Sequence, residues 1–154
     1  MRIESVFRYG EKIPERYTCD GMNISLPIII FDVPMEAKSL VLIMYDPDIP
    51  QFVKDRFQVD EWNHWILFNI DSSASEIPEG SSSFVGMLGM NTNGKTGYTG
   101  PCPPDRQHRY FLKLYALNRV LGLNRGATRE GIEKAMKGAI ISQTELMGVY
   151  EKKK

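Results

Sequence analysis

The sequence predicts one mostly β domain with a single clear helix late in the chain. Several short apolar runs are rich in aliphatic and β-branched residues and are bounded by prolines or acidic residues, which is typical of strands. Only residues 128–140 repeat their apolar side chains at helical spacing. The length of 154 residues, with 42% hydrophobic and 25% charged residues, suits one domain with a sizeable core.

Four segments before the helix are predicted strands: 27–33 (PIIIFDV), 39–46 (SLVLIMYD), 64–71 (HWILFNID) and 109–117 (RYFLKLYAL). The fourth is rich in aromatic residues, so we expect both of its faces to be partly buried. A last strand-like run, TELMGVY at 144–150, closes a single domain that spans residues 1–150, and the tail 151–154 (EKKK) is expected to be frayed.

The helix is predicted from its cap and from its spacing. Thr128 is a favourable N-cap residue, and Glu130 follows in the first turn, where the helix dipole favours a carboxylate. Apolar residues then recur at helical spacing, at Ile132, Ala135, Met136, Ala139 and Ile140.

Two segments, 9–25 and 72–107, lack periodicity. The second is rich in glycine and proline and leads directly into a predicted strand, so we expect a functional loop. Within it, GMNTNGKT at 89–96 matches the phosphate-loop pattern, which requires a helix that begins at the lysine. The following TGYTGPCPPD prevents that helix, because an interior proline costs about 3 kcal/mol and each glycine nearly 1. We therefore interpret the match as false.

The charge balance excludes some partners. The chain has 19 basic and 19 acidic residues, so no nucleic-acid partner is expected. Apolar runs such as LVLIMY are too short to span a bilayer, which predicts no stable membrane insertion. A cytoplasmic protein is expected, because charges near the start leave no room for the apolar segment of a secretory signal; they are Arg2, Glu4, Arg8, Glu11 and Lys12.

The two cysteines, Cys19 and Cys102, are too few for a disulfide scaffold or a closed zinc site. Without a secretory signal, two free thiols are the favoured interpretation, and a bridge between them is the alternative.

Polar residues that could form a site lie where loops meet the predicted strands: Asp46, Asp48, His64, His108 and Tyr110. Imidazoles, a tyrosine hydroxyl and the backbone amides of a glycine- and proline-rich loop can donate to an anion, and an aspartate beside a histidine raises the pKa of the imidazole. The structural alternative is that the histidines are satisfied core groups and the aspartates form turns.

Catalysis finds little support in the sequence. There is no nucleophile elbow and no metal-binding spacing, so no catalytic residue, metal or cofactor is expected. A Ser-His-Asp arrangement with Ser81, Ser82 or Ser83 stays open, because these serines lie in the unassigned loop.

Four motifs, taken together and in order, resemble the phosphatidylethanolamine-binding protein family, also called the Raf-kinase-inhibitor-like family, and especially its short bacterial and archaeal members. The motifs are IPERYTCDGMNIS (13–25), DPDIP (46–50), EWNHW (61–65) and GYTGPCPPDRQHRY (97–110). The resemblance covers nearly the whole chain and implies a central antiparallel β-sandwich with a few peripheral helices.

The resemblance also implies a small anion cavity at one end of the sandwich. Asp46, His64, His108 and Tyr110 would line it, and Asp48, Pro50, Trp62, Gly100, Pro103 and Pro104 would shape it. A cis Ile49–Pro50 bond is expected beside it. Arg106 replaces the glycine of the family motif, so it is either strained at positive φ or adds a cation at the cavity mouth.

By this resemblance, the protein is expected to be a non-enzymatic regulator that binds a small phosphorylated or other anionic ligand. It would act as an inhibitor of a kinase or a serine protease. Segment 50–60 is expected to be an exposed, solvated loop, and the alternative is that it presents an extended stretch to a partner. The alternative is a small hydrolase that uses Asp46 and His64 as acid and base. A homodimer is compatible with the zero net charge.

Overall fold

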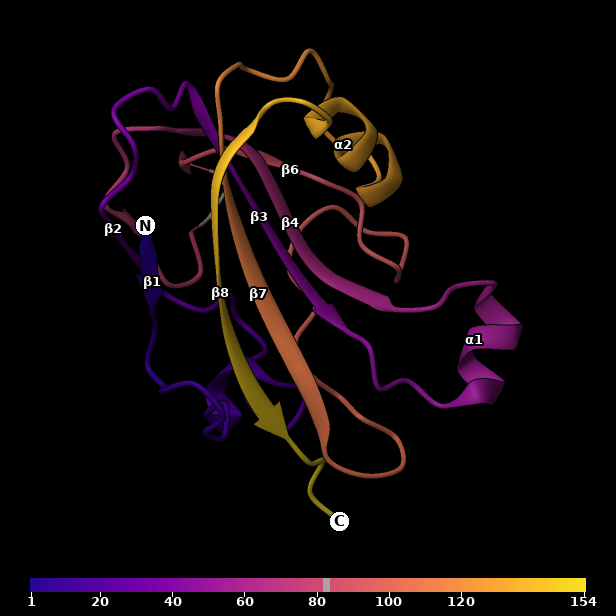
Figure 1. Cartoon of the computed structure of the whole chain (residues 1–154). Helices are drawn as coiled ribbons and strands as arrows, with labels where there is room; N and C mark the ends of the chain where they lie inside the picture. The colour runs from indigo at the N-terminus through magenta and orange to yellow at the C-terminus, as the bar shows by residue number, and fades with distance from the viewer. Residues whose placement is uncertain (82–83) are drawn as a thin grey trace.

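A five-stranded antiparallel sheet dominates the fold (Figure 1). The computed structural model describes residues 1–81 and 84–154. The strand order in the large sheet is β6 (Met87–Leu88), β4 (Trp62–Asp71), β3 (Ser39–Asp46), β7 (His108–Leu117) and β8 (Ile140–Tyr150). A second antiparallel sheet has the order β1 (Arg2–Glu4), β2 (Ile28–Phe31) and β5 (Glu76–Ile77). The predicted mostly β fold with two antiparallel sheets is confirmed.

The main core lies between the two sheets. Side chains from the small sheet, such as Ile28 and Ile77, share one buried cluster with Leu42 and Leu112 of the large sheet. Strand β3 is buried along its whole length because its side chains alternate between this core and a second cluster on the other face. Because both faces of β3 are buried, its sequence is one continuous apolar run.

The predicted helix is confirmed as α2 (Arg129–Met136). The Thr128 side chain caps it by accepting a hydrogen bond from the backbone amide of Gly131, at 3.1 Å. Ile132 and Met136 are buried in the second cluster, where α2 covers the outer face of the large sheet. The helix is shorter than its spacing suggested, since Ile140 already begins β8.

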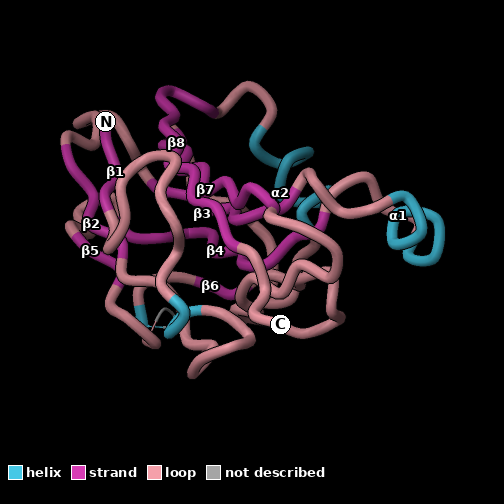
Figure 2. Tube along the Cα trace, turned by 90° about the horizontal axis from the view of Figure 1, so that it is seen from below, coloured by secondary structure: helices cyan, strands magenta, loops and turns pink. Residues whose placement is uncertain are grey.

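Two expectations about the stretch after β3 are wrong. Segment 50–60 is not an extended loop but holds a short helix, α1 (Gln51–Phe57), which projects from the body of the fold (Figures 1 and 2). The Ile49–Pro50 bond is trans, as are all peptide bonds among the described residues. The carbonyl of Pro50 accepts the first helical hydrogen bonds, from Val53 and Lys54, so Pro50 is the N-cap residue at which α1 begins.

The two segments without periodicity contain little regular structure. Segment 9–25 holds one 3₁₀ turn (Glu15–Tyr17), and segment 72–107 holds the two-residue strands β5 and β6 and an isolated bridge between Met90 and Thr96 among its described residues. None of the helices in residues 1–81 and 84–154 is long and apolar enough to cross a membrane.

Candidate functional site

A cavity of about 220 Å³ lies at the end of the large sheet, where β3 ends and its neighbours β4 and β7 begin. Antiparallel pairing brings the last residue of β3, Asp46, opposite Trp62 at the start of β4. The cavity is lined by eight of the predicted site residues: Asp46, Pro50, Trp62, His64, Gly100, Pro103, Pro104 and Tyr110. The other two, Asp48 and His108, are not among its lining residues, although both contact Asp46.

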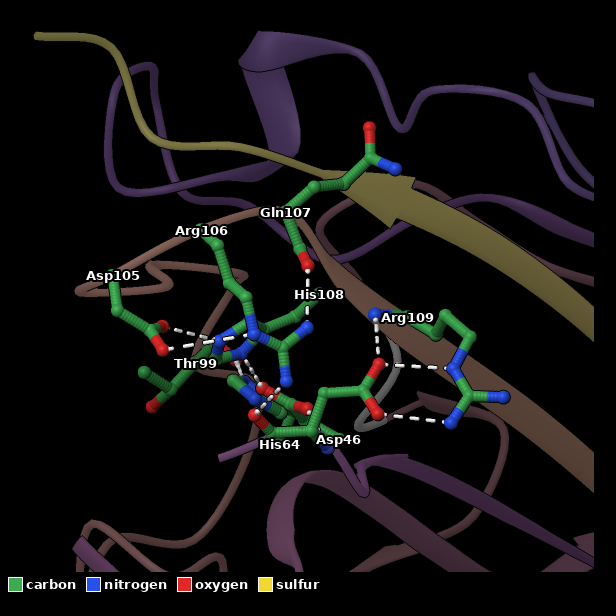
Figure 3. A network of polar contacts seen from close by, with 9 residues as sticks. Asp46, His64, Thr99, Asp105, Arg106, Gln107, His108 and Arg109 are labelled. Atoms are coloured by element: carbon green, nitrogen blue, oxygen red, sulfur yellow. Dashed lines mark hydrogen bonds and ion pairs between the residues drawn. The ribbon is translucent and has the colours of Figure 1, made fainter. Parts of the chain in front are cut away.

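His108 is the buried centre of a chain of three charged groups (Figure 3). Its Nδ1 lies 2.7 Å from Oδ2 of Asp46, and its Nε2 lies 2.6 Å from Oδ1 of Asp105. Burial works against the charged ring, but the hydrogen bonds and charges of the two carboxylates outweigh it and raise the pKa of His108. His108 therefore contacts a residue of the cavity wall, Asp46, without lining the cavity itself.

Asp48 is directed at Arg109, not at the cavity. The Arg109 guanidinium binds both carboxylate oxygens at 2.9 Å, and the Arg109 amide adds a third bond at 2.8 Å. These contacts lower the pKa of Asp48. Its backbone amide donates to Oδ1 of Asp46 at 2.7 Å, so Asp48 orients the cavity carboxylate through the main chain.

His64 faces the cavity from β4 and is 6% exposed. Its Nδ1 donates to the carbonyl of Thr99 at 2.7 Å, which fixes the orientation of the ring. Burial is the main cause that lowers the pKa of His64, so the ring is neutral at pH 7. With the hydrogen on Nδ1, Nε2 of the neutral ring is an acceptor.

Tyr110 contributes an unpartnered donor. Its side chain is fully buried, lines the cavity, and has no hydrogen-bond partner for its hydroxyl among the described residues. Burial raises the pKa of Tyr110, so the hydroxyl keeps its hydrogen. A buried polar group without a partner is costly, so an acceptor that reached this hydroxyl would remove that cost.

The segment around Gly100 forms one wall and is tied to segment 9–25. The Gly100 amide donates to Oδ1 of Asn23 at 2.8 Å, and the Tyr98 hydroxyl donates to the carbonyl of Tyr17 at 2.8 Å. A disulfide joins Cys19 to Cys102. The expectation of free thiols is therefore wrong: the fold brings the two Cα atoms within 5.4 Å, although 83 positions separate them in sequence.

Several lining residues were not predicted. From the β3–β4 connection come Ile49, Val53 and Phe57, and from the glycine-rich segment come Asn93, Thr99 and Cys102. Phe57 packs edge-on against Trp62, with ring centroids 4.9 Å apart. The apolar residues of segment 50–60 are the only sequence signal that could have indicated the apolar part of the wall.

The phosphate-loop match is false, as predicted from its context. No helix begins at Lys95, whose amide instead donates to Oδ1 of Asn91 within a tight loop. This loop contributes to the cavity in another way, because Asn93 accepts a hydrogen bond from the Trp62 indole at 3.0 Å.

Arg106 is not strained, since it is absent from the positive-φ residues of the described chain. Its guanidinium is exposed, lies 3.8 Å from the Asp105 carboxylate and reaches the carbonyl of Asp48 at 3.5 Å. Its cation thus lies beside Asp48 and Asp105, and Arg106 is not among the residues that line the cavity. Of the serines considered for a catalytic arrangement, Ser82 and Ser83 lie outside the described residues.

Comparison with known proteins gives consistent matches. The family model described as phosphatidylethanolamine-binding protein matches residues 3–151. A UPF0098 protein of Chlamydia trachomatis serovar D is 48% identical over 99% of both chains, and a UPF0098 protein of Methanothermobacter thermautotrophicus is 45% identical over 92% of this chain and 91% of the relative.

Two solved structures share the fold along the whole chain. One is a candidate phosphatidylethanolamine-binding protein homolog from Chlamydia trachomatis, with a TM-score of 0.92, 47% identity and coverage of 98% of this chain and 97% of that one. The other is Escherichia coli YbcL, a member of the mammalian PEBP family, with a TM-score of 0.86, 25% identity and coverage of 99% and 98%.

Proposed function

The chain belongs to the phosphatidylethanolamine-binding protein family, and on this premise we propose that it binds a small phosphorylated or other anionic ligand in the cavity between His64 and Tyr110. The observation that carries the proposal is the buried Tyr110 hydroxyl, a donor without a partner among the described residues. Family membership supports an anion as its acceptor.

The carboxylate of Asp46 does not prevent an anion from entering. One of its oxygens accepts from the Asp48 amide and the other faces His108, so its negative charge is offset within the protein. His64 can add a second donor when it takes up a proton.

We also propose that the protein acts as a regulator, by sequestering its ligand or by blocking a kinase or a serine protease. Family resemblance alone supports this part. The hydrolase alternative is weaker, because both Asp46 oxygens are already engaged and Cys102, the cysteine in the wall, is bonded to Cys19. The disulfide also favours an oxidising compartment over the cytoplasm that the N-terminal charges predict.

Replacing Tyr110 by phenylalanine tests the binding proposal. It removes only a hydroxyl that has no partner in the described protein, so the fold should be retained. Because a hydrogen bond to a charged group contributes about 1.5–3 kcal/mol, phosphate should bind about 10- to 150-fold more weakly. Affinity is measured by titrating inorganic phosphate and phosphoethanolamine while following the His64 and His108 ring signals by NMR.

The matched control is Tyr115→Phe, on the same strand but on the outer face of the sheet. It should leave phosphate affinity unchanged. Ring signals that do not move at millimolar phosphate in the unmodified protein would rule out the proposed function.

The pH dependence of binding follows from the lowered pKa of His64. An anion favours the protonated ring, so binding should raise this pKa and take up one proton. The affinity for the anion should be constant at pH values below the pKa of His64 in the free protein, which lies under the ordinary value of about 6.5. As the pH rises above that pKa, the affinity should fall by about tenfold per pH unit. Inorganic sulfate is the suitable probe, because its own charge does not change in this range.

His64→Gln keeps a side-chain donor but cannot titrate. In this variant the sulfate affinity should no longer change between about pH 5 and 7. An equally steep decline in the variant would show that another group takes up the proton.

A further inference from the structure

The chain of Asp105, His108 and Asp46 links the protein surface to the cavity wall (Figure 3). We propose that Asp105 is a positioning residue of the site: it holds His108 as an imidazolium, and this charge offsets the Asp46 carboxylate so that an anion can bind. The inference rests on the proposed anion-binding function and extends it to a residue that does not line the cavity.

The geometry of the ring defines its protonation state. Both nitrogens of His108 lie within 2.7 Å of a carboxylate oxygen, and the side chain is completely buried. A neutral imidazole has only one N–H, so one of the two carboxylates would face a lone pair at hydrogen-bond distance. Only the imidazolium can donate to both, and Asp105 is therefore part of what keeps the charge on the ring.

The two carboxylates differ in their access to water. The Asp46 side chain is 3% exposed, whereas that of Asp105 is 36% exposed. The inner pair of Asp46 and His108 is neutral as a unit, and the surplus negative charge lies on Asp105, at the surface beside the Arg106 guanidinium. An anion in the cavity therefore meets a neutral pair instead of a bare carboxylate.

The other groups around His108 do not replace Asp105. From β4, the His64 ring lines the cavity, and an imidazole carries no negative charge in either protonation state. On β7, Tyr110 stacks roughly parallel to His108 with a neutral hydroxyl, and Arg109 is paired with Asp48. From β8, the register partner Tyr150 donates its hydroxyl to Asp20. Asp46 and Asp105 are thus the carboxylates that hold the ring charge.

Asp105→Asn tests the inference with almost no change of shape. An asparagine oxygen can still accept from Nε2, but the negative charge is lost. The pH midpoint of His108, followed through its ring ¹⁵N signals without ligand, should fall by about 1–3 pH units. At a pH where His108 is neutral in the variant but still charged in the unmodified protein, the variant should bind phosphate at least about tenfold more weakly. The reason is that Asp46 then carries an uncompensated charge.

In Asp105→Glu the pH midpoint of His108 should stay high, because a carboxylate is kept. The control Asp71→Asn changes a surface aspartate that caps a turn with Ser73, and it should change neither the His108 midpoint nor the phosphate affinity. An unchanged His108 midpoint in Asp105→Asn overturns the inference, and so does unchanged phosphate affinity where the ring is neutral. If the unmodified protein does not bind phosphate although Asp105→Asn lowers the midpoint, the proposed function itself fails, and the role of Asp105 in anion binding fails with it.

Discussion

Replacing Cys102 by serine is expected to lower the free energy of unfolding by about 4.5 kcal/mol in the absence of reductant. The bond closes a loop with a sequence separation of 83, and the loss of loop-closure entropy in the unfolded chain grows with the logarithm of loop length. The loss would be a large part of the total stability of a domain of this size, which is typically about 5–15 kcal/mol. Urea unfolding followed by tryptophan fluorescence measures the change.

Three comparisons isolate the bond as the cause. Cys19→Ser, Cys102→Ser and the double variant should be equally destabilised, since each removes the same bond, and the unmodified protein in strong reductant should match them. A double variant that is clearly less stable than either single one would show that the sulfur atoms also contribute through packing, so the bond would not be the whole cause. Phosphate affinity should also fall in all three variants, because Cys102 lines the cavity beside Gly100.

The strands were predictable because burial leaves a pattern in the sequence. β3 is an uninterrupted apolar run bounded by polar residues, and the structure begins and ends it at the predicted residues, Ser39 and Asp46. α2 was predictable because its cap, Thr128, and its buried residues, Ile132 and Met136, follow helical rules. α1 was missed because none of its seven residues is buried, so no apolar periodicity marks it.

The site was predictable only where single motifs supply it. Asp46, His64 and Tyr110 were placed by the motifs in which they occur, and the structure brings them to one cavity. The disulfide and the wall around Gly100 depend on how two aperiodic segments meet in space, which no local pattern describes. Asp105 was missed for a related reason: a turn returns its carboxylate to the ring of His108, three residues further along.

Gly100→Ala is the second change with a large expected effect. A Cβ at this position would lie well under 3.0 Å from both the Tyr17 carbonyl oxygen and Oδ1 of Asn23, closer than such atoms approach in proteins. Tyr17 presents backbone, and Asn23 is bound to the Gly100 amide, so neither can move without loss of a contact. We expect a destabilisation of at least about 3 kcal/mol, the upper end of what overpacking usually costs. Thermal and urea unfolding measure it.

The loss of stability in Gly100→Ala should come from the close contact of the added Cβ and not from the loss of a glycine as such. A Cβ added at Gly122 would meet no atom within 4 Å, and the φ of Gly122 is not positive, so Gly122→Ala should change stability by less than about 1 kcal/mol. In Gly100→Ala the two segments must separate, which moves the cavity wall, so phosphate affinity should fall together with stability. A Gly100→Ala protein as stable as Gly122→Ala would mean that the wall does not lie against Tyr17, and the cavity would then have a different shape.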